Sequence, residues 1–269
     1  MNPATSTRCL EKCYGGGMRT VLLAMVLSGC AAGPRQLTQI QGRWVETTVR
    51  GRGAPVVVFE SGLGADVSAW DQVLPEVAAF ATAFAYSRPG LGHSERTETP
   101  RTGRVVIEEL RATLRSRGLA PPYVLVGHSL GGLYLQLFAR RYPQEVAALV
   151  LLDSSHPAQL AGARGRPPRT WWTTLLNLYM TGTRGREFRG LNGTGEEVLA
   201  TPTYEGPVFV LNAGKPPSEP IDAQARLRVD LAALYPRSEL RWIDSTHDIP
   251  RRHPRAVIEL VREAVERAR

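Results

Sequence analysis

A single G-x-S-x-G pattern, at residues 127–131, supplies the chain with a candidate nucleophile. Its serine, Ser129, follows an apolar run of strand length and precedes a stretch of helical period. In a tight strand-to-helix turn the serine hydroxyl projects outward, and small residues are needed two positions before and after it because the backbone folds back there. Gly127 and Gly131 occupy those positions. The spacing therefore predicts nucleophilic chemistry at Ser129.

A serine hydroxyl needs a partner that takes its proton, because its alkoxide fraction at neutral pH is negligible. Histidine is suited to this role, and the chain has five histidines. The helix expected to begin at Leu130 points its amino terminus at the serine, so the Leu130 N–H is a candidate donor to a tetrahedral oxyanion. Such chemistry requires a histidine from elsewhere in the chain to reach Ser129.

The elements that position these residues are predicted from alternating apolar runs and helical-period stretches after residue 44. Strands are expected at 44–49, 55–60, 82–86, 123–126, 146–152, 207–211 and 239–243, and helices at 68–80, 104–117, 130–141, 221–235 and 254–269. The first strand alternates and is expected at an antiparallel edge. This order predicts an α/β domain over 44–269, with a mostly parallel sheet between helices. Residues 154–206 break the alternation and are expected to form an insertion.

Three motifs together resemble the α/β-hydrolase superfamily over residues 44–268: the 127–131 turn, Gly90-Leu91-Gly92-His93-Ser94, and Thr246-His247-Asp248. The resemblance implies the α/β-hydrolase fold, with the 154–206 insertion as a small cap. It also implies a serine hydrolase with a catalytic triad. Relatives that attack with aspartate, the haloalkane dehalogenases and epoxide hydrolases, are disfavoured because the elbow holds Ser129.

The resemblance assigns the remaining triad members. His247 follows the last strand and precedes the closing helix, where the family has its base. The family's commonest acid position falls at residues 212–215, which contain no carboxylate. Some members take the acid from the end of the preceding strand, which favours Asp153; Glu219 and Asp222 stay as alternatives. His93 and His128 are interpreted as residues that line the pocket, and His156 and His253 have no assigned role, although His156 could line the substrate site.

The second oxyanion donor of the family follows the strand that corresponds to residues 55–60, which makes the Leu63 N–H the candidate beside that of Leu130. One departure from the family pattern is Ser87, where an aspartate is usual. Ser87 is expected to affect the bracing of its loop rather than the chemistry.

The expected reaction is hydrolysis of a small-molecule carboxylic ester through an acyl-enzyme intermediate. The insertion holds Trp171, Trp172, Leu175, Leu176, Leu178, Tyr179 and Met180, which either favour an acyl or aromatic ester or only pack the insertion onto the domain. A proline-iminopeptidase-like peptidase and an acyltransferase are the alternative activities, and a non-catalytic envelope-binding protein that keeps the fold is the alternative from another class. No cofactor and no metal is expected, since the chain lacks metal-ligand spacings, a Walker loop and a dinucleotide fingerprint.

The amino-terminal segment has the order of a bacterial export signal. Met18-Arg19-Thr20 precedes the apolar run 21–27, which is too short to span a bilayer, and small residues follow. Residues 27–30, Leu-Ser-Gly-Cys, resemble the lipobox, in which the peptide is cut before the cysteine and the cysteine is lipidated. The expectation is a signal peptide at 1–29, with Met18 as an alternative start, then a lipidated tether at 30–43 anchored through Cys30 to the bacterial cell envelope.

The composition limits the size of the fold, the kinds of partner and the disulfides that can be expected. With 269 residues and 43% apolar content the chain can bury one substantial core, and a monomer is expected. A net charge of +8 comes almost entirely from arginines that are scattered among acidic residues, so nucleic-acid binding is not expected. All three cysteines lie within the first 30 residues, so the domain at 44–269 forms no internal disulfide.

Overall fold

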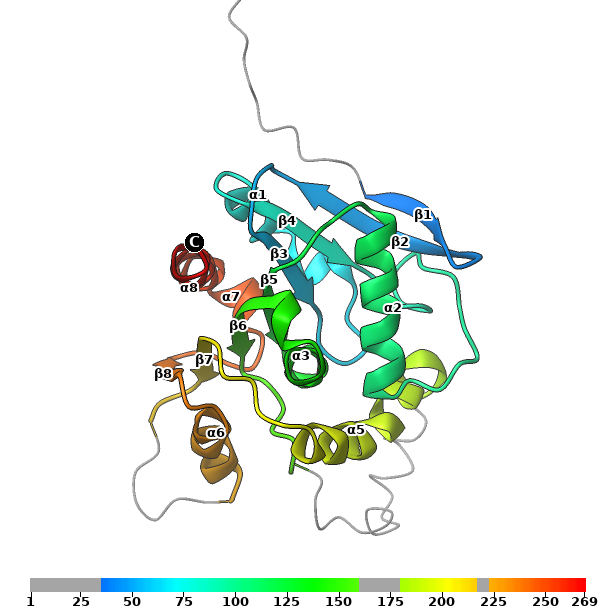
Figure 1. Cartoon of the computed structure of the whole chain (residues 1–269). Coiled ribbons are helices and arrows are strands. Elements are labelled where there is room, and N and C mark those ends of the chain that lie inside the picture. The colour runs from blue at the N-terminus through cyan, green and yellow to red at the C-terminus, as the bar shows by residue number, and fades with distance from the viewer. Residues whose placement is uncertain (1–34, 160–179, 217–222) are drawn as a thin grey trace, which may run out of the picture. The chain divides into compact units, whose positions relative to one another are not determined.

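The computed structural model describes residues 35–159, 180–216 and 223–269. Within them, eight strands form one sheet in the order β1-β2-β4-β3-β5-β6-β7-β8 (Figure 1). The strands are β1 (Gln36–Ile40), β2 (Arg43–Arg50), β3 (Val56–Glu60), β4 (Thr82–Tyr86), β5 (Tyr123–His128), β6 (Val146–Leu152), β7 (Val208–Ala213) and β8 (Ser238–Ile243). The β1–β2 and β2–β4 pairs are antiparallel, and the pairs from β4 to β8 are parallel. The predicted α/β class with a mostly parallel sheet is confirmed.

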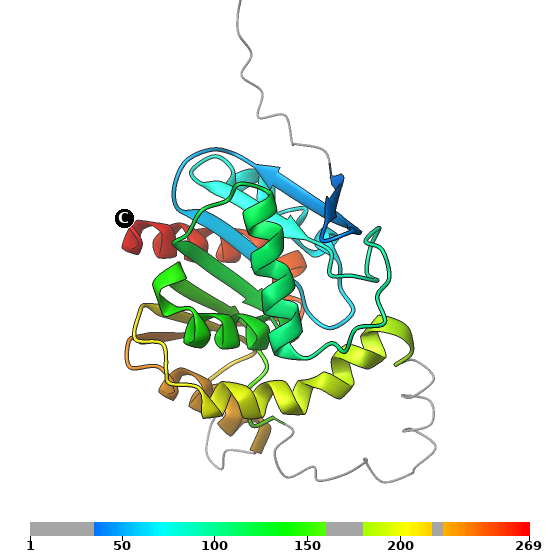
Figure 2. The same ribbon diagram turned by 45° about the vertical axis from the view of Figure 1, so that its right-hand side comes forward.

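Helices cover both faces of the sheet (Figure 2). They are α1 (Leu74–Val77), α2 (Gly103–Ser116), α3 (Leu130–Arg141), α5 (Gly182–Ala200), α6 (Ala223–Ala233), α7 (Ile249–Arg252) and α8 (Pro254–Arg267), with 3-10 turns η1 (Val67–Trp70) and η2 (Pro143–Glu145). Strand alternation divides the core: in β3, Val56 and Val58 face the cluster under α2 and α3, while Val57 and Phe59 face the cluster under α1 and α8. The central strands are apolar throughout because both of their faces are buried.

Two predicted elements differ from the structure. The helix predicted at 68–80 is instead η1 and the single turn of α1. Pro75 lies at the start of α1, and its ring has no N–H for the carbonyl of residue 71 and clashes with that carbonyl, so a helix cannot run through this point. The prediction was wrong because it followed the apolar period across a proline.

The strand predicted at the sheet edge, 44–49, lies inside the sheet as part of β2. The edge strand is β1, from residues that were expected to form a tether. Gln41 and Gly42 both have positive φ (49° and 80°), as in the two-residue hairpin turn that matches strand twist. Residues 36–43 therefore belong to the sheet. Among the described residues, no helix has the length and apolar content that a bilayer crossing needs.

Candidate active site

Ser129 lies in a strained turn between β5 and α3. Its φ of 54° and ψ of −123° are unfavourable for a residue with a side chain. The end of β6 holds this turn, because the Ser129 N–H donates to the Leu152 carbonyl (3.1 Å) and the Ser155 N–H donates to the Ser129 carbonyl (3.1 Å). The glycines are required here: a Cβ on Gly127 would overlap the backbone of α3, and one on Gly131 would overlap the backbone at the end of β3.

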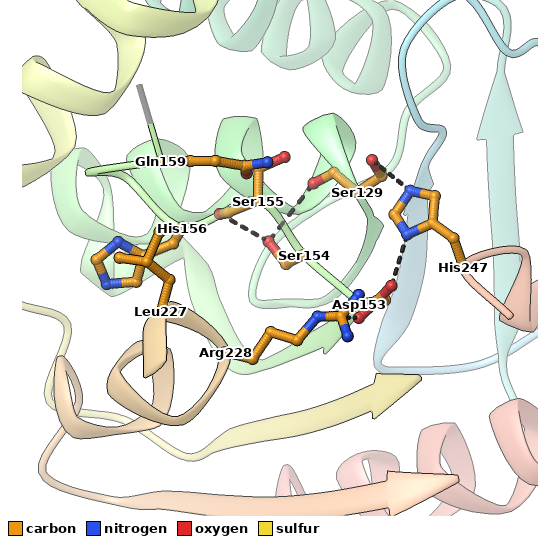
Figure 3. Close-up of a pocket in the computed structure, with 9 residues that line it drawn as sticks. All are labelled: Ser129, Asp153, Ser154, Ser155, His156, Gln159, Leu227, Arg228 and His247. Atoms are coloured by element: carbon orange, nitrogen blue, oxygen red, sulfur yellow. Dashed lines mark hydrogen bonds and ion pairs between the residues drawn. The ribbon is translucent and has the colours of Figure 1, made fainter. Parts of the chain in front are cut away.

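Three side chains that are far apart in the sequence form one hydrogen-bonded chain (Figure 3). His247, in the loop between β8 and α7, has its Nε2 2.9 Å from Ser129 Oγ. Its Nδ1 lies 2.6 Å from Oδ2 of Asp153, which directly follows β6. Because a carboxylate only accepts, Nδ1 carries the proton and Nε2 is left to accept from the Ser129 hydroxyl. The structure thus brings together the three residues that the sequence analysis selected.

Asp153 is held as a buried carboxylate, with 3% of its side chain exposed. Burial raises the pKa of Asp153, but the hydrogen bond from His247 and the charge of Arg228 outweigh burial, so the pKa is lowered. The other oxygen, Oδ1, accepts from the Ala213 N–H (3.2 Å) and lies 3.5 Å from Arg228 Nε. Asp153 is therefore ionised at neutral pH and fixed in place by groups from β7 and α6.

Comparison with known proteins identifies the fold. A family model described as the alpha/beta hydrolase fold matches residues 55–180. A thermophilic esterase from Thermogutta terrifontis superposes with a TM-score of 0.62 at 20% identity, over 88% of this chain and 99% of the esterase. The chain has the α/β-hydrolase fold. The enol-lactonase from Burkholderia xenovorans LB400 shares this fold (TM-score 0.61, 18% identity, 86% of this chain and 100% of the lactonase), as does the epoxide hydrolase CorEH (0.64, 18%, 88% and 99%).

Relatives found by sequence match this chain at low identity, between 24% and 32% for the three described below. YqjL of Bacillus subtilis is 24% identical over 213 residues, which are 77% of this chain and 82% of YqjL. YbdG of the same organism is 28% identical over 129 residues, 47% of this chain and 40% of YbdG. The abhydrolase domain-containing protein abhd-5.2 of Caenorhabditis elegans is 32% identical, over 37% of this chain and 23% of its own length. The chain thus spans most of YqjL but less than half of the other two proteins.

Within this α/β-hydrolase fold, His128 contacts the loop that carries His247. Its Nε2 lies 2.8 Å from the backbone carbonyl of His247, and the two imidazole rings are 4.7 Å apart. A carbonyl only accepts, so Nε2 of His128 carries a proton. Burial, reinforced by repulsion from His247, lowers the pKa of His128 to about 4, and the ring is neutral at pH 7. From the sequence, His128 was expected only to line the pocket. Its contact with His247 joins residues 119 positions apart, so no local spacing predicts it.

A cavity of about 280 Å³ opens beside Ser129. The residues that line it are Ser129, Asp153, Ser154, Ser155, His156, Gln159, Leu227, Arg228 and His247. Of these, Leu227 alone is apolar. His156, which had no assigned role, lines the cavity, whereas His93, predicted to line the pocket, lies outside it, with 77% of its side chain exposed beside Glu46. The described wall of this cavity is polar and carries one cationic side chain, Arg228.

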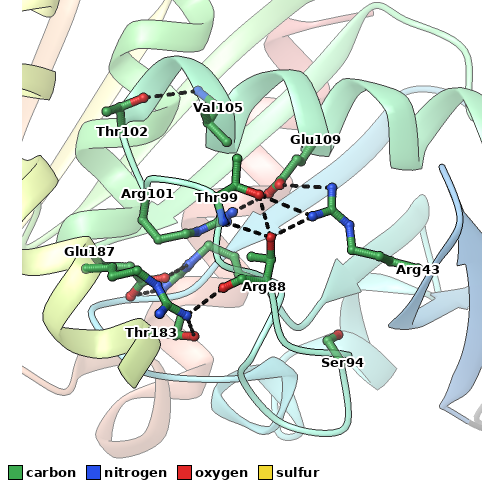
Figure 4. A network of polar contacts seen from close by, with 12 residues as sticks. Arg43, Arg88, Ser94, Thr99, Arg101, Thr102, Val105, Glu109, Thr183 and Glu187 are labelled. Carbon is green, nitrogen blue, oxygen red and sulfur yellow. Dashed lines mark hydrogen bonds and ion pairs between the residues drawn. The ribbon is translucent and has the colours of Figure 1, made fainter. Parts of the chain in front are cut away.

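Residues 61–64, the loop after β3, lie against Ser129. A Cβ built on Gly62 would lie 3.3 Å from the Ser129 Cβ, so the two backbones are close neighbours. Arg88, which follows β4, is fully buried against this loop and pairs with Glu187 (Figure 4). Its second buried carboxylate partner is Glu60. The nearby Ser87 braces its loop, as predicted, because its hydroxyl donates to Glu46 (2.7 Å).

Some predicted site residues lie outside the described residues. They are Glu219, Asp222, Cys30 and the insertion residues from Trp171 to Tyr179. Among the residues that the structure does describe, no group of three or more His, Cys, Asp or Glu side chains is placed to hold a metal ion.

Proposed function

We propose that this protein is a serine hydrolase that cleaves carboxylic esters through an acyl-enzyme intermediate. The observation that carries the proposal is the continuous hydrogen-bonded chain from Ser129 Oγ through His247 to Asp153, at 2.9 and 2.6 Å. These distances lie within the reach that nucleophile activation by a general base requires. The esterase and lactonase that share the fold are consistent with hydrolysis at an acyl carbon.

In the first half-reaction, Ser129 Oγ attacks the ester carbonyl carbon while His247 Nε2 takes the hydroxyl proton. Asp153 stabilises the imidazolium that forms, since its carboxylate already accepts from Nδ1. Collapse of the tetrahedral intermediate breaks the bond to the alcohol oxygen, and His247 returns the proton to this leaving group. The acyl group then remains on Ser129.

Water completes the cycle by attacking the acyl carbon while His247 takes one of its protons. Collapse of this second tetrahedral intermediate breaks the bond from the acyl carbon to Ser129 Oγ, and His247 returns the proton to Oγ. The negative oxygen of both tetrahedral intermediates needs donors, for which we propose the N–H groups of Leu130 and Leu63. Leu130 is the first residue of α3, so its N–H has no acceptor within the helix. Leu63 belongs to the loop that packs against the nucleophile.

The cavity beside Ser129 favours a substrate with a polar portion. Its described wall offers hydroxyl, amide and imidazole groups, and the Arg228 guanidinium is 44% exposed. A guanidinium in a partly enclosed site binds carboxylates well, because it presents parallel N–H donors. We therefore propose an ester whose acyl or alcohol portion bears a carboxylate or a similar oxygen-rich group.

The experiment that tests the reaction combines covalent labelling with turnover. Wild-type protein is expected to react with a fluorophosphonate probe and to hydrolyse 4-nitrophenyl butyrate, and Ser129→Ala should lose both while it stays folded by circular dichroism. Turnover of proline 4-nitroanilide in preference to the ester would favour the peptidase alternative. Acylation of an added alcohol in preference to water would favour the acyltransferase. A wild-type protein that takes no label would indicate the non-catalytic alternative.

We also propose that the protein is anchored in the bacterial envelope through lipid on Cys30. The support is the lipobox-like sequence at residues 27–30 and the apolar run before it. Metabolic labelling with a palmitate analogue should mark the wild-type protein and not Cys30→Ala. An unlabelled wild-type protein in the soluble fraction would exclude the anchor.

A further inference from the structure

The buried guanidinium of Arg88 donates hydrogen bonds to two consecutive backbone carbonyls of the 61–64 loop. Arg88 Nη1 donates to the Ser61 carbonyl (2.6 Å), and Nη2 donates to the Gly62 carbonyl (2.6 Å). The peptide unit that joins Gly62 to Leu63 is planar, so its C=O and N–H point in opposite directions. Holding the Gly62 carbonyl toward Arg88 therefore sets the direction of the Leu63 N–H, which points away from the guanidinium.

Apart from Arg88, the 61–64 loop is held by hydrogen bonds at its two ends: the Gly62 carbonyl also accepts from the Ala65 N–H (3.2 Å), and the Ser61 hydroxyl donates to the Asp66 carbonyl (3.0 Å). Gly62 and Gly64 have no side chains, and Leu63 is only partly buried. Gly64 adopts a φ of 65°, which glycine tolerates and most other residues avoid. Hydrogen bonds to the backbone must therefore supply the order that side-chain packing supplies elsewhere in the core.

Glu187, from helix α5 of the insertion, binds both Arg88 and the 61–64 loop (Figure 4). Its Oε1 accepts from Arg88 Nε (2.6 Å), and its Oε2 accepts from Arg88 Nη2 (3.1 Å). The same Oε2 also accepts from the Gly64 N–H at 3.1 Å. One fully buried carboxylate therefore orients the arginine and binds the far end of the loop directly.

A further contact to Arg88 comes from the end of a strand of the sheet. Glu60, the last residue of β3, accepts from Arg88 Nη1 (2.5 Å) and from the Tyr86 hydroxyl (2.6 Å). Burial opposes the charge on Arg88, but the two carboxylates outweigh it and raise the pKa of Arg88 well above its ordinary value. The guanidinium is therefore charged, and its donors are directed at the loop and at these two carboxylates.

We propose that Glu187 is a positioning residue for ester hydrolysis, holding the 61–64 loop so that the Leu63 N–H faces the oxyanion. This inference rests on the proposed function, because only a reaction at Ser129 gives the loop an oxyanion to bind. It gives the insertion a role in the reaction, since α5 would align a catalytic amide. A buried ion pair contributes little net stability in general, so alignment of the loop is a reason to retain this one.

The test replaces Glu187 by glutamine, which keeps the side-chain shape. In the wild type, Oε1 accepts from Arg88 Nε while Oε2 accepts from Arg88 Nη2 and the Gly64 N–H. A glutamine has an NH₂ group in place of one of these oxygens, so this group faces N–H donors whichever way the amide is turned, and the two-sided contact is lost. We expect kcat for 4-nitrophenyl butyrate to fall about 10- to 100-fold in Glu187→Gln, somewhat less than complete loss of an oxyanion donor, with KM changed less than about threefold. The affinity for a boronic acid that forms a tetrahedral adduct with Ser129 should fall by a similar factor.

A matched control is Glu197→Gln. Glu197 lies on the same helix, is partly exposed and pairs with Arg141 at 3.0 Å, so this variant loses one charge from α5 without touching the loop. Its kcat should equal that of the wild type. Titration with the fluorophosphonate counts the active sites in each preparation, so kcat is compared per functional site and misfolded protein does not enter the comparison.

Glu187→Asp separates alignment from charge. It keeps the buried charge but shortens the side chain, so it cannot span Arg88 and the Gly64 N–H together. A folded Glu187→Asp with reduced kcat supports alignment, and recovery of full kcat would indicate that only the charge is needed and would overturn the proposal. Unchanged kcat per labelled site in Glu187→Gln, or an effect confined to KM, would overturn it as well. If the wild type takes no fluorophosphonate label, the proposed function itself fails.

Discussion

His128 Nε2 donates a hydrogen bond of 2.8 Å to the backbone carbonyl of His247. The residue that precedes the nucleophile thereby holds the loop that carries the proposed base. This contact is separate from the hydrogen bond that His247 makes with Asp153, which orients the ring rather than the backbone. The His247 carbonyl also accepts from the Ile249 N–H (3.0 Å), so these contacts together hold the imidazole relative to Ser129.

Replacing His128 by phenylalanine should make the position of His247 less well defined and slow turnover. The substitution keeps a ring of similar size but removes the only donor that His128 offers to the His247 carbonyl. We expect kcat to fall about tenfold, since one buried hydrogen bond contributes about 1–2 kcal/mol and its loss lets the loop shift. Steady-state kinetics with 4-nitrophenyl butyrate measures this, with the exposed His93→Gln as the control. A His128→Phe enzyme with wild-type kcat would show that the contacts of His247 with Asp153 and Ile249 suffice to place the base.

His128 should also make stability depend on pH. Its pKa is lowered from 6.5 to about 4 in the folded protein, so the unfolded chain binds its proton first as the pH falls. The stabilisation is fully present above pH 6.5 and is lost progressively toward pH 4, by roughly 3 kcal/mol for this one group. Urea unfolding at pH 7 and pH 4.5 measures the loss. The free energy of unfolding should fall less in His128→Phe than in the wild type, and equal slopes would contradict the assignment.

Replacing Asp153 by asparagine should affect turnover more strongly than any other change at a carboxylate of this site. The asparagine amide does not provide the negative charge that stabilises imidazolium, and its NH₂ group favours the wrong tautomer of His247. We expect kcat to fall about 10³-fold or more with little loss of stability. Asp222→Asn and Glu219→Gln serve as comparisons, and a larger loss in either one would move the acid away from Asp153.

Arg228 should determine selectivity for charged substrates. We expect wild-type protein to hydrolyse mono-4-nitrophenyl adipate in preference to 4-nitrophenyl hexanoate, which has the same acyl chain length but no carboxylate. Arg228→Gln should reduce the ratio of kcat/KM for the two esters by about tenfold, as for loss of one charge-assisted hydrogen bond.

The exposed Arg226, on the same helix but outside the cavity lining, provides the charge-matched control for this prediction. Arg226→Gln should leave the ratio unchanged. If Arg228→Gln and the wild type have equal ratios, the guanidinium serves only as a neighbour of Asp153.

Local sequence was sufficient for much of the fold. Helix α3 and strand β6 have the predicted bounds because their apolar periods are strong and unbroken. The turn at Ser129 was predictable for a similar reason, since the glycines that relieve its crowding lie within two residues of it. The helix predicted at 68–80 failed where Pro75 outweighs the apolar period, and β1 was missed because a short edge strand carries little periodic signal.

Tertiary structure decided which distant side chains meet. Asp153 and His247 are 94 residues apart and come within 2.6 Å because parallel strands bring their carboxyl ends to one edge of the sheet. The ion pair between Glu187 and Arg88 joins residues 99 positions apart. It depends on where α5 of the insertion packs, and the spacing of neighbouring residues does not determine that position. Residue types and short spacings specify the chemistry that a segment can perform, whereas the order of strands and the packing of helices select the partners that make it possible.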